Sequence, residues 1–231
     1  MKKLLVAALA LALAACTVAP VEKTTVTVFA AASLTDTFQE IADAFTAENP
    51  DVEVVFNFGG SSGLATQIVE GAPADVFAAA SPATMEASGA KSPQDFATNV
   101  LEIAVAKGNP GQIEGLEDFA NPDRLIALCA VEVPCGAASD KLLTEKGITP
   151  SVDTYEQDVK AVLTKVELGE VDAGLVYVTD VLESGLVGIT VDTAPVSYPI
   201  AALTTQGAAF VDFVLSAKGQ QILAKAGFGA P

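Results

Sequence analysis

The sequence has no histidine and no tryptophan, and its 231 residues include a single arginine, Arg124. The absence of histidine excludes Ser-His-Asp and Cys-His catalysis, histidine-ligated zinc and imidazole acid–base chemistry. A lone arginine excludes an arginine cluster that clamps an anion, and the lack of tryptophan removes the best wall for a cation cage. We therefore expect any bound anion to be held mainly by short-range hydrogen bonds.

Basic residues are scarce as well. The chain carries 12 lysine and arginine residues against 29 aspartate and glutamate residues, a formal net charge of −17. No basic surface for nucleic acid is expected from this balance, and the acidic residues are read as a solvated face. A hydrophobic content of 51% over this length is enough for a sizeable core, in one large domain or in two lobes of about 100 residues each.

The N-terminus reads as an export signal. Met-Lys-Lys is followed by an apolar run over 4–15, which is too short to span a bilayer, so we interpret residues 1–15 as a signal peptide. Leu13-Ala14-Ala15-Cys16 resembles a bacterial lipobox, which implies cleavage before Cys16, lipidation of its thiol and a tether over 16–23 on the outer face of a membrane. The alternative is a soluble exported protein with an incidental cysteine. Loss of the leader removes two lysines and makes the net charge −19.

The two remaining cysteines are Cys129 and Cys135. An even pair in an exported protein suggests a disulfide, and so short a loop would add about 2 kcal/mol to stability. A pair of buried, inert thiols is the competing interpretation.

Strand-like and helix-like segments alternate along the chain, which predicts an α/β fold with a largely parallel sheet. A break over 107–111 is followed by a second alternation, so we expect two lobes with a ligand cleft at the carboxyl ends of their strands. The alternative is one continuous doubly wound sheet. The expected first lobe comprises residues 24–103 and 197–231, and the second comprises 104–196. Strands are predicted over 26–29, 52–56, 74–79, 101–107, 125–129 and 173–178, and helices over 34–45, 64–68, 154–168 and 207–226, with another ending at 146.

Two turns in the first lobe have the chemistry of an anion site. They are Ala30-Ala31-Ala32-Ser33-Leu34-Thr35 and Gly59-Gly60-Ser61-Ser62-Gly63-Leu64, and each follows an apolar run and precedes a helix-periodic segment. Each turn places a hydroxyl and unpaired backbone N–H groups at a helix start, where the helix dipole favours a negative ligand. The alternative is that Ser33 and Ser61 or Ser62 are ordinary helix N-caps.

Four stretches together resemble a known family. They are Val28-Phe29-Ala30-Ala31-Ala32-Ser33-Leu34-Thr35, Gly60-Ser61-Ser62-Gly63, Gly71-Ala72-Pro73-Ala74-Asp75-Val76-Phe77 and Gly174-Leu175-Val176-Tyr177. In order and spacing they are similar to the periplasmic molybdate-binding proteins of ABC transporters, over nearly the whole mature chain. The resemblance implies a bilobal periplasmic-binding-protein fold of the type II kind, in which two lobes of mixed or parallel sheet flanked by helices enclose a tetrahedral oxyanion.

The resemblance also implies the ligand contacts. It assigns hydroxyl donors from the first lobe, with the choice between Ser61 and its neighbour Ser62 left open, and backbone and phenol donors from the second lobe: Ser33, Ser61, the N–H groups of Cys135 and Val159, and Tyr177. The family commonly has alanine where this chain has Cys135, which keeps the backbone donor but alters the turn. A Cys129–Cys135 disulfide would fix that turn.

The expected function is therefore an exported, lipid-anchored receptor that captures molybdate, and tungstate as well, for import through the membrane permease of an ABC transporter. We expect a monomer that binds no nucleic acid, has no cofactor and no directly coordinated metal cation, and is not an enzyme. The main alternative is a receptor for another tetrahedral oxyanion, such as sulfate or phosphate. Two remoter alternatives are an exported hydrolase with a serine nucleophile, which would need a base other than histidine, and an adhesion lipoprotein with a vestigial cleft.

Overall fold

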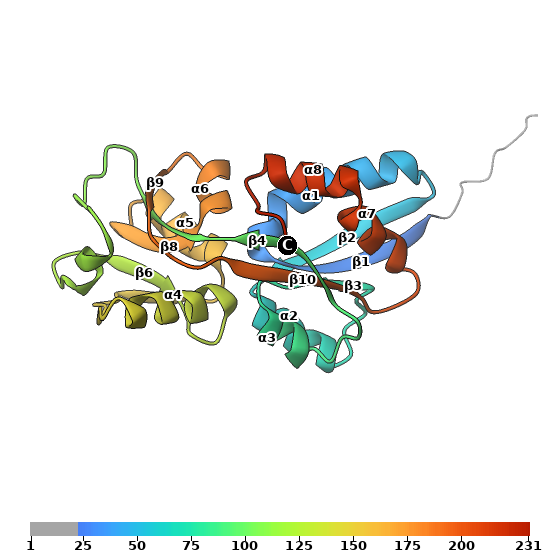
Figure 1. Ribbon diagram of the computed structural model, residues 1–231, viewed down its shortest axis with the longest axis horizontal. Coiled ribbons are helices and arrows are strands. Elements are labelled where there is room, and N and C mark those ends of the chain that lie inside the picture. The colour runs from blue at the N-terminus through green and yellow to red at the C-terminus, as the bar shows by residue number, and fades with distance from the viewer. Residues whose placement is uncertain (1–22) are drawn as a thin grey trace, which may run out of the picture.

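The computed structural model of the chain describes residues 23–231, so the expected signal peptide, Cys16 and most of the tether lie outside the described residues. The described part folds into two lobes, each built on its own five-stranded sheet (Figure 1). The prediction of two lobes of mixed or parallel sheet is thus confirmed, with both sheets mixed, and the alternative of one continuous sheet is wrong. None of the helices described has the length and apolarity needed to cross a membrane.

The first lobe contains both ends of the described chain. Its elements are β1 (Thr24–Ala31), η1 (Ala32–Leu34), α1 (Thr35–Glu48), β2 (Val52–Gly59), α2 (Ser61–Val69), β3 (Val76–Ala78), α3 (Pro82–Ala87), β4 (Gln94–Asn99), β10 (Val196–Ala202), α7 (Ala208–Leu215) and α8 (Ala217–Lys225).

The sheet of this lobe has the order β2-β1-β3-β10-β4. Strand β1 is parallel to β2 and β3, whereas β10 is antiparallel to β3 and β4. Helices α1, α7 and α8 cover one face and α2 and α3 cover the other (Figure 1). Neighbouring residues of a strand serve opposite faces, as in β1, where Val28 packs in the cluster with Phe38 and Phe210 while Phe29 packs with Leu64.

The second lobe is one continuous segment inserted between β4 and β10. Its elements are β5 (Leu101–Val105), η2 (Leu116–Ala120), β6 (Ile126–Cys129), α4 (Pro134–Glu145), β7 (Thr154–Glu156), α5 (Val159–Glu167), β8 (Ala173–Tyr177), α6 (Val178–Glu183) and β9 (Val187–Thr190). The sheet order is β7-β6-β8-β5-β9, with β6 parallel to β7 and β8, and β5 antiparallel to β8 and β9. Figure 1 shows α4 on one side of this sheet and α5 and α6 on the other.

The chain crosses between the lobes twice, from β4 to β5 and from β9 to β10. The expected lobe boundary between residues 103 and 104 falls inside strand β5. Strand β5 pairs only with strands of the second sheet, and β10 pairs only with strands of the first. Two crossings that lie together are the usual hinge of a bilobal protein, because a few residues there absorb the rotation of one lobe against the other.

The predicted elements agree with the structure where a clear period supports them. The apolar stripe of α5 consists of Val159, Val162, Leu163 and Val166, and all four side chains are buried. The predicted start of this helix at 154 is wrong, because 154–156 form the edge strand β7 and Asp158 caps the helix by accepting a hydrogen bond from the Ala161 N–H at 3.0 Å.

The predicted terminal helix over 207–226 is wrong as a single element. It is divided at Ser216, whose backbone is extended and whose hydroxyl caps α8 by accepting from the Gly219 N–H at 3.3 Å. Elements α3, β4, α6 and β9 had no predicted counterpart, and all four are short.

Candidate functional site

A small cavity lies between the lobes at the carboxyl ends of six strands. Strands β1, β2 and β3 deliver the lining from the first lobe, and β6, β7 and β8 deliver it from the second. This is where the carboxyl ends of parallel strands are expected to place a ligand. The lining residues are Ala31, Ala32, Ser33, Gly59, Gly60, Ser61 and Ala80 on one side, and Val133, Pro134, Cys135, Asp158, Val159 and Tyr177 on the other.

The structure brings together at this cavity all five residues that the sequence analysis selected: Ser33, Ser61, Cys135, Val159 and Tyr177. Each of the five is at most 4% exposed. Ser62, the other candidate in the second turn, is not among the lining residues.

Ser33 lies in the short helix η1 that follows β1. Its Oγ lies 2.9 Å from the phenol oxygen of Tyr198, which comes from β10 of the same lobe. Burial raises the pKa of Tyr198 well above its ordinary value, so the phenol keeps its proton. When Tyr198 donates to Ser33, the hydroxyl proton of Ser33 is free for another acceptor.

Ser61 is the first residue of α2. Its Oγ accepts a hydrogen bond from the Ala80 N–H at 3.0 Å, so its own proton remains available for a ligand. Neither Ser61 nor Ser33 makes a side-chain cap to its helix, which contradicts their interpretation as N-caps. Ser62 instead donates across the cleft to the Glu132 carbonyl at 2.5 Å.

The second turn also has the spacing of a hydrolase nucleophile elbow, which the sequence analysis missed. Gly59, Ser61 and Gly63 form a Gly-x-Ser-x-Gly pattern at a strand-to-helix turn. An elbow serine needs a base within hydrogen-bond reach. In the described part of the chain, the Ser61 hydroxyl accepts a hydrogen bond from the Ala80 backbone N–H, and no hydrogen bond joins it to a basic or carboxylate side chain. The turn therefore presents a hydrogen-bond donor rather than an activated nucleophile.

Two helix starts face the serines from the second lobe. Cys135 is the second residue of α4, after Pro134, and Val159 is the first residue of α5. The first N–H groups of a helix have no acceptor within the helix, and the helix dipole makes this end favourable for a negative charge. Two helices thus direct backbone donors at the cavity without any cationic side chain.

The predicted disulfide is present. It joins Cys129, the last residue of β6, to Cys135, and the two Cα atoms are 5.7 Å apart. The enclosed turn is tight, since a β-carbon at Gly136 would overlap the Ala130 carbonyl. The bond fixes the loop that carries both a cavity-lining backbone N–H and the Glu132 carbonyl bound by Ser62.

Tyr177 ends β8 and is 1% exposed. Its phenol oxygen is buried and has no hydrogen-bond partner in the described structure, although a buried hydroxyl normally has one. Burial, with the nearby Asp180 carboxylate, raises the pKa of Tyr177 well above its ordinary value, so the group stays a neutral donor. The unpaired hydroxyl is an open position for a ligand acceptor.

The size and charge of the cavity limit what it can hold. Its volume is about 10 Å³, close to that of one water-sized sphere, so only a compact ligand fits between the closed lobes. Asp158 is the one charged side chain in the lining, and no lysine or arginine belongs to it. Within residues 23–231, no group of three or more histidine, cysteine, aspartate or glutamate residues is placed to hold a metal ion.

Two contributors to the site had no specific signal in the sequence, and the role of a third, Gly60, was visible only as part of a turn. Tyr198 reaches Ser33 from a strand more than 160 residues away, and Ala80 contributes only its backbone N–H. Gly60 lies against the Gln157 carbonyl of the other lobe, where a β-carbon would overlap it. The double glycine before Ser61 was the only available hint of this close approach.

Comparison with protein families gives one match over nearly the whole described chain. The model for "Bacterial extracellular solute-binding protein" matches residues 26–229. The chain is also 41% identical over 222 residues to the molybdate-binding protein ModA of Mycobacterium tuberculosis, covering 89% of this chain and 85% of that protein.

Solved structures agree on the fold. The periplasmic molybdate-binding protein of Azotobacter vinelandii superposes with a TM-score of 0.76 at 22% identity, covering 89% of this chain and 99% of the other. The sulfate-binding protein SubI of Mycobacterium tuberculosis gives a TM-score of 0.75 at 19% identity, covering 89% of this chain and 86% of the other. Solved structures of proteins named for two different anions thus match the fold of this chain almost equally well, so the fold by itself does not identify the ligand.

Proposed function

The chain belongs to the bacterial extracellular solute-binding proteins, and we propose that it captures molybdate, and tungstate as well, for import by an ABC transporter. Its partner is then the membrane permease of that transporter. Retention at the membrane surface through lipidated Cys16 is part of the proposal.

The observation that carries the proposal is the donor set of the cavity. Two serine hydroxyls, one phenol and the N–H groups at two helix starts surround a space without a cationic side chain. The free proton of Ser61 and the unpaired hydroxyl of Tyr177 both require an acceptor. Each oxygen of a fully deprotonated oxyanion accepts hydrogen bonds, so such a ligand satisfies these donors together.

The same donor set favours a dianion with no proton of its own. Hydrogenphosphate carries an O–H that needs an acceptor, and an unsatisfied buried polar group costs about 1–3 kcal/mol. Asp158 is the one lining side chain that offers such an acceptor and so weakens this discrimination: its Oδ1 accepts the Ala161 N–H, whereas its Oδ2 has no hydrogen bond in the described structure. The 41% identical relative is named for molybdate, which supports this anion over sulfate.

In this proposal, rotation of the two lobes about the hinge captures the anion. The anion enters between separated lobes and binds the serines of one lobe, and closure brings the helix starts and Tyr177 of the other onto it. The closed lobes present a continuous surface to the permease, and reopening there releases the anion.

The test is thermal unfolding of the ligand-stripped domain with molybdate, tungstate, sulfate and phosphate in separate samples. An anion at 1,000 times its dissociation constant adds about 4 kcal/mol to the free energy of unfolding. We expect large upward shifts in Tm with molybdate and tungstate and small shifts with the other two anions. A flat response to molybdate beside a large response to sulfate or phosphate would assign the chain to another oxyanion.

A further inference from the structure

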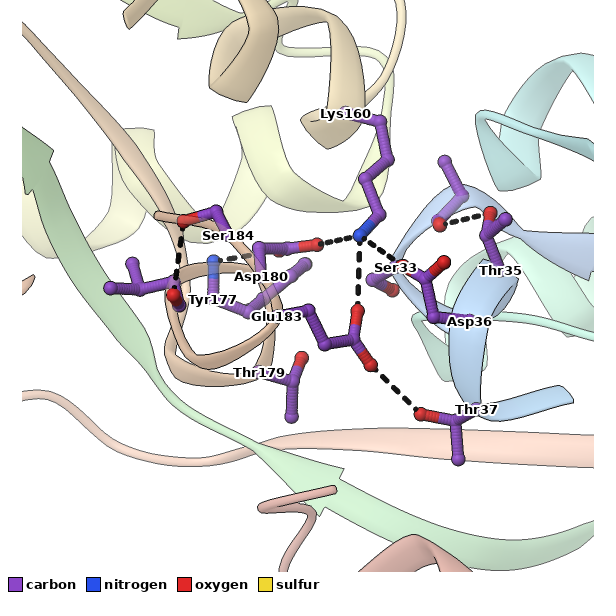
Figure 2. Close-up of polar contacts among 12 residues, drawn as sticks. Ser33, Thr35, Asp36, Thr37, Lys160, Tyr177, Thr179, Asp180, Glu183 and Ser184 are labelled. Atoms are coloured by element: carbon purple, nitrogen blue, oxygen red, sulfur yellow. Dashed lines mark hydrogen bonds and ion pairs between the residues drawn. The ribbon is translucent and has the colours of Figure 1, made fainter. Parts of the chain in front are cut away.

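Beside the ligand cavity, a second group of polar residues joins the lobes. It consists of Lys160 from α5, Asp180 and Glu183 from α6, and Asp36 and Thr37 from α1, and we call it the Lys160 cluster (Figure 2). None of these five residues lines the cavity. The group therefore contacts no bound anion directly.

Within the second lobe, the cluster connects two of the elements that carry ligand donors. Lys160 directly follows Val159 at the start of α5, and its Nζ lies 3.6 Å from Oδ1 of Asp180. The other oxygen of Asp180 accepts the Tyr177 N–H at 3.0 Å. Lys160 thus links the start of α5 to the junction of β8 and α6.

The same ammonium group reaches the first lobe. Lys160 Nζ donates to Asp36 at 3.0 Å and to Glu183 at 3.1 Å. Glu183 in turn accepts from the Thr37 hydroxyl of the first lobe at 3.1 Å. Asp36 and Thr37 stand in the first turn of α1, directly after the η1 turn that holds Ser33.

Within the described range 23–231, the Lys160–Asp36 ion pair is the one that joins the two lobes. The side chain of Lys160 is 25% exposed and that of Asp180 is 0% exposed, so the cluster has a buried end and a solvent-facing end. Asp180 Oδ1 is buried without a hydrogen bond, and the Lys160 ammonium is its charge partner. A lysine already anchored by its own lobe loses less conformational freedom when it contacts Asp36 than a free side chain would.

We propose that Lys160 is a positioning residue that latches the closed lobes together and thereby slows release of the bound anion. Asp180 and Glu183 hold the ammonium in place, and Asp36 and Thr37 are its counterparts on the first lobe. The latch exists only when the lobes are closed, so it stabilises the bound state more than the open state. This inference rests on the proposed function, because it concerns retention of the same anion.

The decisive comparison pairs Lys160→Met with Lys165→Met. Lys165 lies on the same helix, is 29% exposed and pairs only with Glu156 and Glu170 of its own lobe. We expect Lys160→Met to weaken molybdate binding by at least about fivefold in calorimetry, through faster release, whereas Lys165→Met binds like wild type. Lys160→Arg should restore most of the affinity. Equal affinities for wild type and Lys160→Met would overturn the proposal.

Asp36→Asn provides a second variant that leaves the buried Asp180 pair intact. In a double-mutant cycle, Lys160→Met and Asp36→Asn should be non-additive, with the double variant no weaker in binding than Lys160→Met alone. Strictly additive losses would mean that the pair makes no latch. Loss of Tm without loss of affinity would mean that Lys160 only supports the fold, which also overturns the proposal.

Small-angle X-ray scattering separates failure of the latch from failure of the proposed function. If wild type binds no molybdate, the proposed function fails. The latch is then tested by scattering from the ligand-free proteins at low salt. A larger radius of gyration for Lys160→Met than for wild type and Lys165→Met would support it. Equal radii would overturn it.

Discussion

Gly60 of the first lobe lies against the Gln157 carbonyl of the second, with no room for a β-carbon between them. The backbone of Gly60 has φ −60° and ψ 126°, which any residue adopts, so the glycine is required by the other lobe and not by its own turn. The two lobes therefore close to backbone contact at the edge of the ligand cavity.

We predict that Gly60→Ala holds the cleft partly open. The added methyl overlaps Gln157 only when the lobes close, so molybdate affinity should fall by at least about tenfold while the ligand-free free energy of unfolding changes by less than about 1 kcal/mol. Gly63→Ala is the matched control, because a β-carbon there meets no atom within 4 Å. Calorimetry on both variants tests this, and a Gly60→Ala protein with wild-type affinity would contradict it.

Tyr177→Phe removes only the unpaired phenol oxygen. A hydrogen bond to a charged group contributes about 1.5–3 kcal/mol, so affinity should fall about 10- to 100-fold. The ligand-free protein should be as stable as wild type or slightly more stable, since a buried unsatisfied hydroxyl is lost. Titration calorimetry and urea unfolding measure the two effects, and a destabilised variant of unchanged affinity would place Tyr177 in the core alone.

Ser61→Ala and Ser62→Ala should differ sharply. Ser61→Ala removes a ligand donor and leaves the buried Ala80 N–H without an acceptor, so both affinity and ligand-free stability should fall, the latter by about 1–3 kcal/mol. Ser62→Ala loses only the bond to the Glu132 carbonyl and should bind within about fivefold of wild type. The reverse ranking of affinities would move the donor role to Ser62.

The disulfide should matter for both stability and binding. Replacing Cys129 and Cys135 together by serine should lower the free energy of unfolding by about 2 kcal/mol, as expected for so short a loop. Molybdate affinity should fall as well, because the loop carries one cavity donor and the contact to Ser62. Gentle reduction of wild type should reproduce both effects, and unchanged affinity in the double variant would show that α4 holds the turn unaided.

The pH dependence of stability should reveal Asp180. Burial raises the pKa of Asp180 to about 7 against the attraction of Lys160, whereas an unfolded aspartate titrates near about 3.9. The folded state therefore binds this proton more tightly than the unfolded state. The contribution of this proton to the free energy of unfolding is therefore fully present below about pH 4. It is lost as the pH rises through about 7.

Asp180→Asn removes this titration but keeps an acceptor for the Tyr177 N–H. The free energy of unfolding of wild type, relative to the variant, should fall between about pH 4 and 7 in urea titrations. The charged and titratable groups that act on Asp180 are Lys160 from α5, Glu183 and Tyr177 beside it, and Tyr198 from β10 of the first lobe. A difference that stays constant with pH would show that Asp180 does not titrate in this range.

Much of the candidate site was predictable because its parts are local. A helix that starts directly after a strand is visible in the sequence, and the carboxyl ends of parallel strands must lie on one edge of a sheet. Ser33, Ser61 and Tyr177 could therefore be placed near one another before any contact was known. The buried apolar face of α5 was predictable for the same reason, since the 3.6-residue period of its apolar residues is a local property of the sequence.

The remaining parts depend on distant pairings. Tyr198 meets Ser33 because β10 returns to the centre of the first sheet, and no pattern around Tyr198 specifies that partner. The start of α5 was misplaced because Asp158 caps the helix while the preceding residues form an edge strand. No sequence pattern marked Lys160, because Asp36 is 124 residues away in the chain and meets it only where the lobes come together.

The insertion of the second lobe between β4 and β10 has a consequence for folding. Strand β4 pairs in the first sheet only with β10, so it has no partner until the last sixth of the chain has been made. The second lobe, by contrast, is complete once β9 has emerged. We expect it to fold as a finished unit while the first sheet is still open, so that closing the long loop back to β4 is a late and slow step in assembly.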